Sequence, residues 1–80
     1  MVRLRLFAGA REAAGTATAE WEASSVGELL NVARTAYGEG FAAVLAASRV
    51  WVNGEEPALG DATPLADGDE VAVLPPVSGG

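Results

Sequence analysis

The stretch SVGELLNVARTAY, residues 25–37, decides the fold class of this chain. Ser25 and Glu28 have the spacing of a capping box, in which the serine hydroxyl accepts the N3 amide and the glutamate reaches back to the cap. Gly38 is placed to end the helix. Between these limits, apolar side chains recur every three or four residues, at Val26, Leu29, Leu30, Ala33 and Tyr37. The sequence therefore predicts one well-patterned helix with a single apolar stripe.

Strand patterns lie on both sides of this helix. Residues 2–7 and 18–23 alternate apolar and polar side chains with the period of a half-buried strand, and a short connection ending at Gly15 joins them into a predicted hairpin. Residues 49–54 form a β-branched and aromatic run that ends in Asn-Gly, a strong turn pattern. Residues 70–74 are apolar or small on both faces, as expected for a central strand.

Two further segments complete the pattern. Residues 41–47 are apolar and rich in alanine, which favours a helical turn or two over a strand. Pro57, Gly60 and Pro64 interrupt the next stretch, which we expect to be a loop with one brief edge strand near Ala58 and Leu59.

The order of these elements predicts an α+β fold, in which a mixed sheet packs one face on one main helix. This order matches the ubiquitin-like β-grasp. We therefore expect a β-grasp domain over residues 1–74 and an extended, flexible diglycine tail over residues 75–80.

Composition excludes several classes of function. The 80 residues contain no Cys, His or Lys, so thiolate, imidazole and Schiff-base chemistry and the usual zinc ligand sets are ruled out, and no metal site is expected. The net charge of −6 comes entirely from residues 55–80, which argues against nucleic acid as a partner. No apolar run reaches membrane-spanning length and no signal-peptide pattern opens the chain. We expect a soluble, cytoplasmic protein.

The last six residues are the predicted functional element. Pro75 and Pro76 stiffen the base of the tail, and the side-chain-free end lets a narrow channel close around the backbone. Six extended residues reach about 20 Å. The Gly80 carboxylate is ionised at neutral pH and is a poor acyl electrophile. Coupling to AMP would activate it, which implies a partner that uses ATP, while the chain itself is expected to bind no cofactor.

The segment DGDEVAVLPPVSGG (residues 67–80), together with REAAG (residues 11–15), resembles the MoaD/ThiS family of ubiquitin-like sulfur carriers, and within it the small subunits of molybdopterin synthase. The resemblance implies that Gly80 is adenylated by an E1-like adenylyltransferase and converted to a thiocarboxylate with sulfur from a sulfurtransferase donor. It also implies that the tail enters the large synthase subunit to deliver sulfur to the pterin precursor, by insertion of Pro75, Pro76, Val77, Ser78 and Gly79. The chain would then be the sulfur-donating subunit of a sulfurtransferase and not a catalyst alone.

A second set of residues is predicted to bind the partner. If Val71 and Val73 face the helix, alternation places Leu74 on the opposite face of the sheet, beside the tail, with Phe7 and Trp51. We expect Phe7, Trp51 and Leu74 to form an apolar docking patch, rimmed by the acidic residues of the last third.

Other interpretations stay open at this stage. A ubiquitin-like modifier that joins its C-terminus to lysines would use the same activation chemistry, and a non-covalent interaction module would make the tail incidental. Carriers of the thiamine and cysteine pathways are similar, and the PPVS ending (residues 75–78) alone favours the molybdenum cofactor. Asp67 and Asp69 lack the glutamate that would complete a calcium loop, so they predict a turn.

Overall fold

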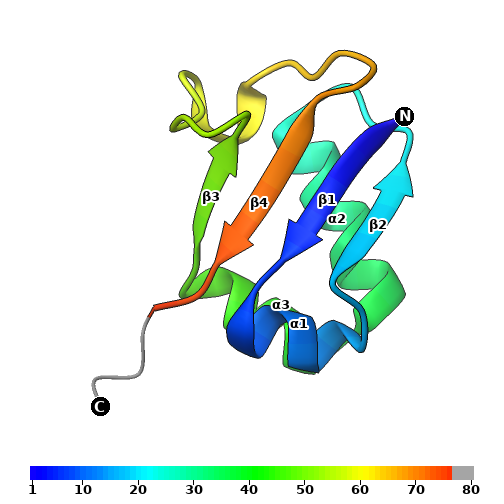
Figure 1. Ribbon diagram of the computed structural model, residues 1–80, viewed down its shortest axis with the longest axis vertical. Coiled ribbons are helices and arrows are strands. Elements are labelled where there is room, and N and C mark those ends of the chain that lie inside the picture. The colour runs from blue at the N-terminus through cyan, green and yellow to red at the C-terminus, as the bar shows by residue number, and fades with distance from the viewer. Residues whose placement is uncertain (77–80) are drawn as a thin grey trace.

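A computed structural model describes residues 1–76 of the chain (Figure 1). Four strands form a sheet, the longest helix lies behind it in the view of Figure 1, and the two shorter helices lie at its lower end. In chain order the elements are β1 (Val2–Leu6), α1 (Ala8–Ala14), β2 (Thr18–Trp21), α2 (Val26–Tyr37), α3 (Glu39–Ala46), β3 (Arg49–Val52), a short 3₁₀ turn η1 (Gly60–Ala62) and β4 (Glu70–Leu74).

The sheet is mixed, with the strand order β2-β1-β4-β3. The central strands β1 and β4 are parallel, with Leu4 opposite Val71, and each edge strand is antiparallel to its neighbour. Parallel neighbours require a crossover connection, and the chain between β1 and β4 supplies it, with α2, α3 and β3 within it. The α+β arrangement and the central position predicted for residues 70–74 are therefore confirmed.

The core lies between the sheet and α2. Alternate residues of β1 and β4 point toward the helix and are buried, and the apolar stripe of α2 covers them. The burial follows the two periods that the sequence shows, two residues for the strands and 3.6 for the helix. The buried residues are Val2, Leu4, Leu6, Ala10, Val26, Leu29, Leu30, Ala33, Phe41, Leu45, Val71 and Val73.

The start of α2 differs in one detail from the predicted capping box. Ser25 is the N-cap, and its hydroxyl oxygen accepts the Glu28 amide at 3.2 Å, as predicted. The Glu28 carboxylate, however, accepts the hydroxyl of Ser24 at 3.0 Å and its amide at 3.3 Å, and so reaches one residue beyond the cap. The negative charge of the carboxylate still lies at the N-terminal end of the helix, where it interacts favourably with the helix dipole.

Helix α1 was not predicted. The connection between β1 and β2 contains a helix of seven residues and is not a short hairpin loop. The helix is capped by Gly15, whose φ is 77°. Strand β1 ends at Leu6, so Phe7 is the N-cap of α1 and not the last strand residue. Ala10 is fully buried and α1 packs on α3, so tertiary packing holds this helix. The predicted antiparallel pairing of the two strands is nevertheless present.

The turn after β3 forms as predicted, but the residues directly after the turn form no strand. Asn53 and Gly54 both have positive φ, 50° and 83°, and Val52 and Glu55 exchange backbone hydrogen bonds of 2.7 and 3.0 Å. The brief edge strand expected near Ala58 and Leu59 is wrong. This part of the connection instead leads into η1, and Leu59 is 66% exposed.

Within residues 1–76, no helix has both the length and the apolar character that crossing a membrane requires.

Candidate functional site

The candidate site is the place where β4 ends. Leu74 is the last residue of β4 and pairs with Arg49 of β3. Pro75 is half-buried and Pro76 is exposed. Pro75 and Pro76 therefore carry the chain out of the middle of the sheet. The predicted acceptor and insertion residues Val77, Ser78, Gly79 and Gly80 lie outside the described residues.

Two shallow grooves border Pro75 and Pro76. The first groove lies on the side of β3 and has a volume of about 290 Å³. Besides the two prolines, it is lined by Ala47, Arg49, Trp51 and Leu74. The second groove lies on the side of the helices and has a volume of about 600 Å³. Besides the two prolines, it is lined by Ala8, Gly9, Glu12, Val44 and Ala47. The base of the tail is thus a ridge between two grooves, which a partner could contact on both sides.

Two of the three predicted docking residues, Trp51 and Leu74, share one face of the sheet, while Phe7 follows the end of β1. Trp51 lies opposite Ala72 of β4, on the face that points away from α2, and it lines the first groove together with Leu74. Phe7 lies across β4 from them, where its amide donates to the Val73 carbonyl at 3.3 Å and its ring lies 5.3 Å from the guanidinium carbon of Arg5. The structure therefore brings Trp51 and Leu74 into one groove, whereas Phe7 does not line this groove and lies next to Arg5.

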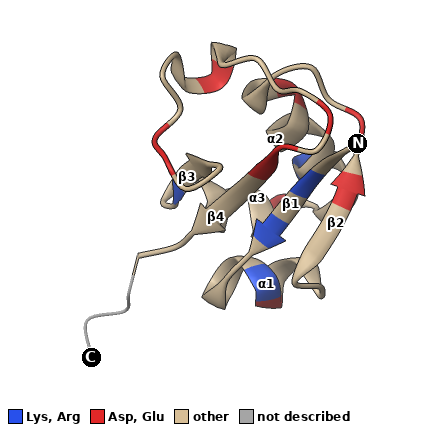
Figure 2. Cartoon of the chain, turned by 45° about the horizontal axis from the view of Figure 1, so that its top comes forward, with Lys and Arg blue, Asp and Glu red and all other residues tan. Residues whose placement is uncertain are grey.

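Charges near this patch are mixed in sign. Arg5 faces Glu70 at 3.6 Å and Arg49 faces Glu56 at 3.8 Å; Glu70 is half-buried and the other three are exposed. Most other acids of the last third lie on the connection between β3 and β4, which gathers at the far end of the sheet (Figure 2). Near the patch, the predicted acidic rim thus contributes two glutamates, each facing an arginine.

Three small residues beside the prolines were missed by sequence reasoning: Ala8, Gly9 and Ala47. Ala8 and Gly9 belong to α1 and Ala47 follows α3, so their position depends on how the two helices pack. A run of small residues near a strand carries no local pattern that assigns it to a site. Only the tertiary structure shows that these residues line the groove, where their small side chains leave space beside Pro75.

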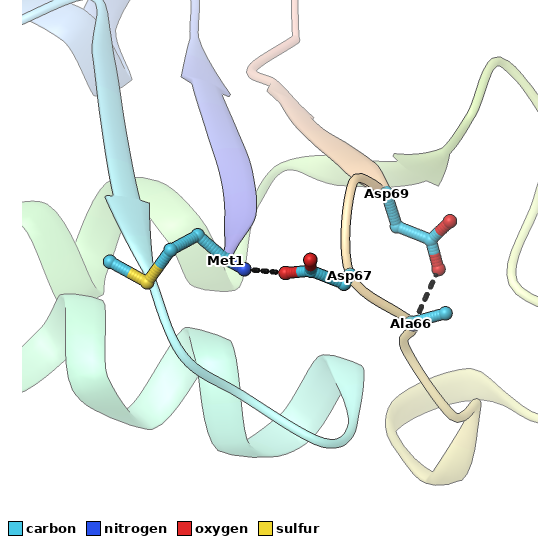
Figure 3. Close-up of polar contacts among 4 residues, drawn as sticks. All are labelled: Met1, Ala66, Asp67 and Asp69. Atoms are coloured by element: carbon cyan, nitrogen blue, oxygen red, sulfur yellow. Dashed lines mark hydrogen bonds and ion pairs between the residues drawn. The ribbon is translucent and has the colours of Figure 1, made fainter.

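Polar contacts concentrate at the opposite end of β4 (Figure 3). The Met1 ammonium pairs with the Asp67 carboxylate, and the Asp69 carboxylate accepts the Ala66 amide at 2.8 Å and the Asn53 side-chain amide at 3.0 Å. These hydrogen bonds hold the pKa of Asp69 below its ordinary value, because they favour the ionised carboxylate. Asp67 and Asp69 therefore act in a turn, as predicted.

Among the described residues, no group of three or more His, Cys, Asp or Glu is placed to hold a metal ion. The buried side chains are all apolar. This part of the chain offers two grooves and a fixed base for the tail.

Comparisons with known proteins agree with this geometry. The model of the ThiS family matches residues 4–80. The solution structure of small archaeal modifier protein 1 from Methanosarcina acetivorans is 30% identical, with 99% of this chain and 95% of that chain covered and a TM-score of 0.87. A putative molybdopterin converting factor subunit 1 from Pyrococcus furiosus is 29% identical, with 95% and 97% covered and a TM-score of 0.81.

A third similar structure is a complex. It contains subunits 1 and 2 of the molybdopterin-converting factor from Helicobacter pylori, at 28% identity, 99% and 97% coverage and a TM-score of 0.75. No curated protein matches the chain. The predicted ubiquitin-like β-grasp is confirmed by these likenesses. With a family match that begins in β1 and runs to Gly80, the chain belongs to the ThiS family and has the ubiquitin-like fold of its sulfur carriers.

Proposed function

We propose that this protein is a sulfur carrier for molybdopterin synthesis and acts as the small subunit of a molybdopterin synthase. The observation that carries the proposal is the family match that extends to Gly80. Likeness over nearly the full length to a molybdopterin converting factor subunit 1 supports the choice of pathway. The complex of subunits 1 and 2 supports a partner protein.

The chemistry is placed at the terminal carboxyl of Gly80. A carboxylate oxygen attacks the α-phosphorus of ATP on an E1-like enzyme, and pyrophosphate leaves. Hydrosulfide, supplied through a sulfurtransferase donor, then attacks the acyl carbon and displaces AMP, and loss of its proton leaves a thiocarboxylate. Glycine suits this role because it offers no side chain to hinder attack at the carbonyl. The partner supplies the ATP site, and the carrier itself holds no cofactor.

The folded part positions this carboxyl. Pro75 and Pro76 leave β4 with fixed φ, which lowers the entropy lost when a partner orders the tail. Val77, Ser78 and Gly79 would then thread into the large subunit. Trp51 and Leu74, with Phe7 beside them, would form the apolar centre of the docking surface, and Arg5 and Arg49 would lie at its polar rim.

Intact mass spectrometry of the protein purified from its native host tests the proposal. Replacement of one oxygen by sulfur at Gly80 adds about 16 Da, and loss of the host's adenylating enzyme should abolish this species. A protein that carries no such species when molybdopterin synthesis is active would contradict the proposal.

A second candidate is a protein modifier that is joined to amines of other proteins. The likeness to small archaeal modifier protein 1 favours it. The same mass experiment separates the two candidates, because a modifier would appear in isopeptide-linked adducts. Carriers for thiamine or cysteine synthesis would also gain about 16 Da, so growth of a carrier-deficient strain on each end product identifies the pathway.

A further inference from the structure

Activation of Gly80 creates a hazard that the rest of the chain must avoid. An acyl adenylate or thioester reacts with any amine or thiolate within reach, and most protein surfaces carry several lysines. All five basic residues of this chain are arginines, and it contains no Lys, Cys or His. A guanidinium stays protonated in proteins and has no free electron pair for attack. The basic side chains therefore supply charge without supplying a nucleophile.

The hydroxyl groups add little reactivity. A neutral hydroxyl is a weak nucleophile unless a neighbouring base activates it, and the chain contains no histidine to act as one. The Ser24 hydroxyl does donate to a carboxylate, that of Glu28, at the start of α2. Burial raises the pKa of Tyr37, which keeps the phenol protonated. Ser48 donates its hydroxyl hydrogen to the Val44 carbonyl at 2.7 Å, and Thr16 donates to the Thr18 carbonyl at 3.0 Å.

The amino group of Met1 is the remaining amine in the printed sequence, and it forms an ion pair at the end of β4 opposite to the tail. Its ammonium pairs with the Asp67 carboxylate, and the Gly68 amide donates to the Met1 carbonyl at 2.9 Å (Figure 3). Because β1 and β4 are parallel, Met1 lies where β4 begins, while Pro75 lies where it ends. The length of β4 separates them, about 13 Å for four steps along a strand. Six extended residues span about 20 Å, so this distance alone does not keep the Met1 amino group from the C-terminus, and the inference for Met1 rests on the ion pair with Asp67.

We infer that no side chain of this protein captures its own activated C-terminus and that Asp67 restrains the Met1 amine, so that the acceptor comes from a partner or target. The inference rests on the proposed activation of Gly80 and holds for both candidate functions. A carrier of this kind does not lose its activated end to its own side chains, and a modifier of this kind offers no lysine at which a second copy could be attached. Capture would form an amide from an amine nitrogen and the Gly80 carbonyl carbon, with release of the activating group and the amine proton.

A chemically activated chain tests the inference without an adenylating enzyme. The full chain is prepared with a small-thiol thioester at Gly80, incubated at neutral pH and followed by intact mass for loss of the thiol and for covalent dimers. Arg49→Lys introduces an amine beside Pro75 and Pro76, and Arg34→Lys introduces one on α2. We expect self-coupling at least about tenfold faster in each lysine variant than in the wild type. Arg49→Lys should give mainly intramolecular amide, and Arg34→Lys should give concentration-dependent dimers.

Asp67→Asn tests the part assigned to Met1, since it removes the carboxylate that pairs with the ammonium. We expect more head-to-tail amide in this variant than in the wild type. Wild-type self-coupling as fast as in the lysine variants would overturn the inference, and an unchanged rate in Asp67→Asn would overturn the role of Asp67. An added small amine should consume all thioesters and so verify activation. Because activation is chemical, these results do not depend on whether cells make the thiocarboxylate.

Discussion

Asp69 holds together the two turns from which β4 begins. Its carboxylate accepts hydrogen bonds from Ala66, within its own turn, and from Asn53, in the turn after β3. The Asn53 side-chain oxygen in turn accepts the Glu70 amide at 2.9 Å. One carboxylate and one amide side chain thus join segments that are 16 residues apart. The start of β4 is fixed by this link, and its end by pairing with β3.

The lowered pKa of Asp69 predicts a pH dependence of stability. Because the folded-state pKa lies below the ordinary value, the carboxylate stabilises the fold fully above that ordinary value, and the contribution is lost as pH falls through the folded-state pKa. Asp69→Asn should lower the free energy of unfolding at neutral pH and narrow its gap to the wild type in acid. Urea unfolding of both proteins between neutral pH and strongly acidic pH measures this. A gap that stays constant across that range would contradict the assignment.

At the scale of elements, the long connection between β3 and β4 is tied to the start of α2. The Val26 amide donates to the Thr63 carbonyl and the Leu65 amide to the Ser24 carbonyl, both at 3.0 Å. Gly27, in the first turn of α2, faces Asp61 of η1 so closely that a Cβ built there would lie 3.1 Å from the Asp61 Cβ and 3.2 Å from its carbonyl oxygen. The absence of a side chain at Gly27 allows this approach.

Two glycine substitutions at matched helix positions test this contact. Gly27 and Gly40 are both the second residue of their helices, and a Cβ at Gly40 would meet nothing within 4 Å. Gly40→Ala should stabilise the fold by about 0.5 kcal/mol, because alanine loses less backbone entropy. Gly27→Ala should instead destabilise it by about 1 kcal/mol through overpacking. Denaturant unfolding measures both, and equal stabilisation by the two would show that Asp61 moves away freely.

The elements differ in how well the sequence predicts them, for physical reasons. The strands and α2 carry their own periodicity, and Ser25 and Gly38 mark the limits of the helix. Helix α1 has no such marks: its N-cap is Phe7, which makes no side-chain cap, and Ala8 at its first position has a φ of 46°. Packing on α3 supplies what the local sequence lacks. The edge strand expected at residues 58–59 does not form, although β3 has a free edge, because the Gly60 amide donates to the Pro57 carbonyl at 3.2 Å and closes a turn over these two residues.

At the scale of the whole molecule, the two ends of β4 have different roles. The acidic turns and Met1 gather where it begins, and the prolines and apolar grooves lie where it ends. Sequence alternation was enough to place Trp51 and Leu74 on one face, because it fixes the direction of strand side chains. It could not place α1 and α3 beside the prolines, since that depends on packing between helices.

If Trp51 and Leu74 form the proposed docking surface, a negative charge introduced there should weaken partner binding, while the same charge introduced elsewhere should not. Leu74→Glu puts a carboxylate into the groove beside Pro75 and Pro76 and should weaken binding to the partner subunit about tenfold or more, with little change in unfolding free energy. Leu59→Glu makes the same change at an exposed position on the connection between β3 and β4 and should leave binding unchanged. Titration calorimetry with the purified partner measures both. Equal affinities for the wild type and Leu74→Glu would remove this surface from the account.

The central claim is that chemistry occurs at the carboxyl carbon of Gly80, while the folded part directs it to its partners. The most direct measurement compares the wild type with a chain that ends at Gly79 and a chain extended by one alanine after Gly80, each assayed for sulfur delivery with the same purified activating enzyme, sulfur donor and partner subunit. We predict that the wild type alone gains about 16 Da and transfers sulfur. Sulfur delivery by either altered chain would contradict the claim.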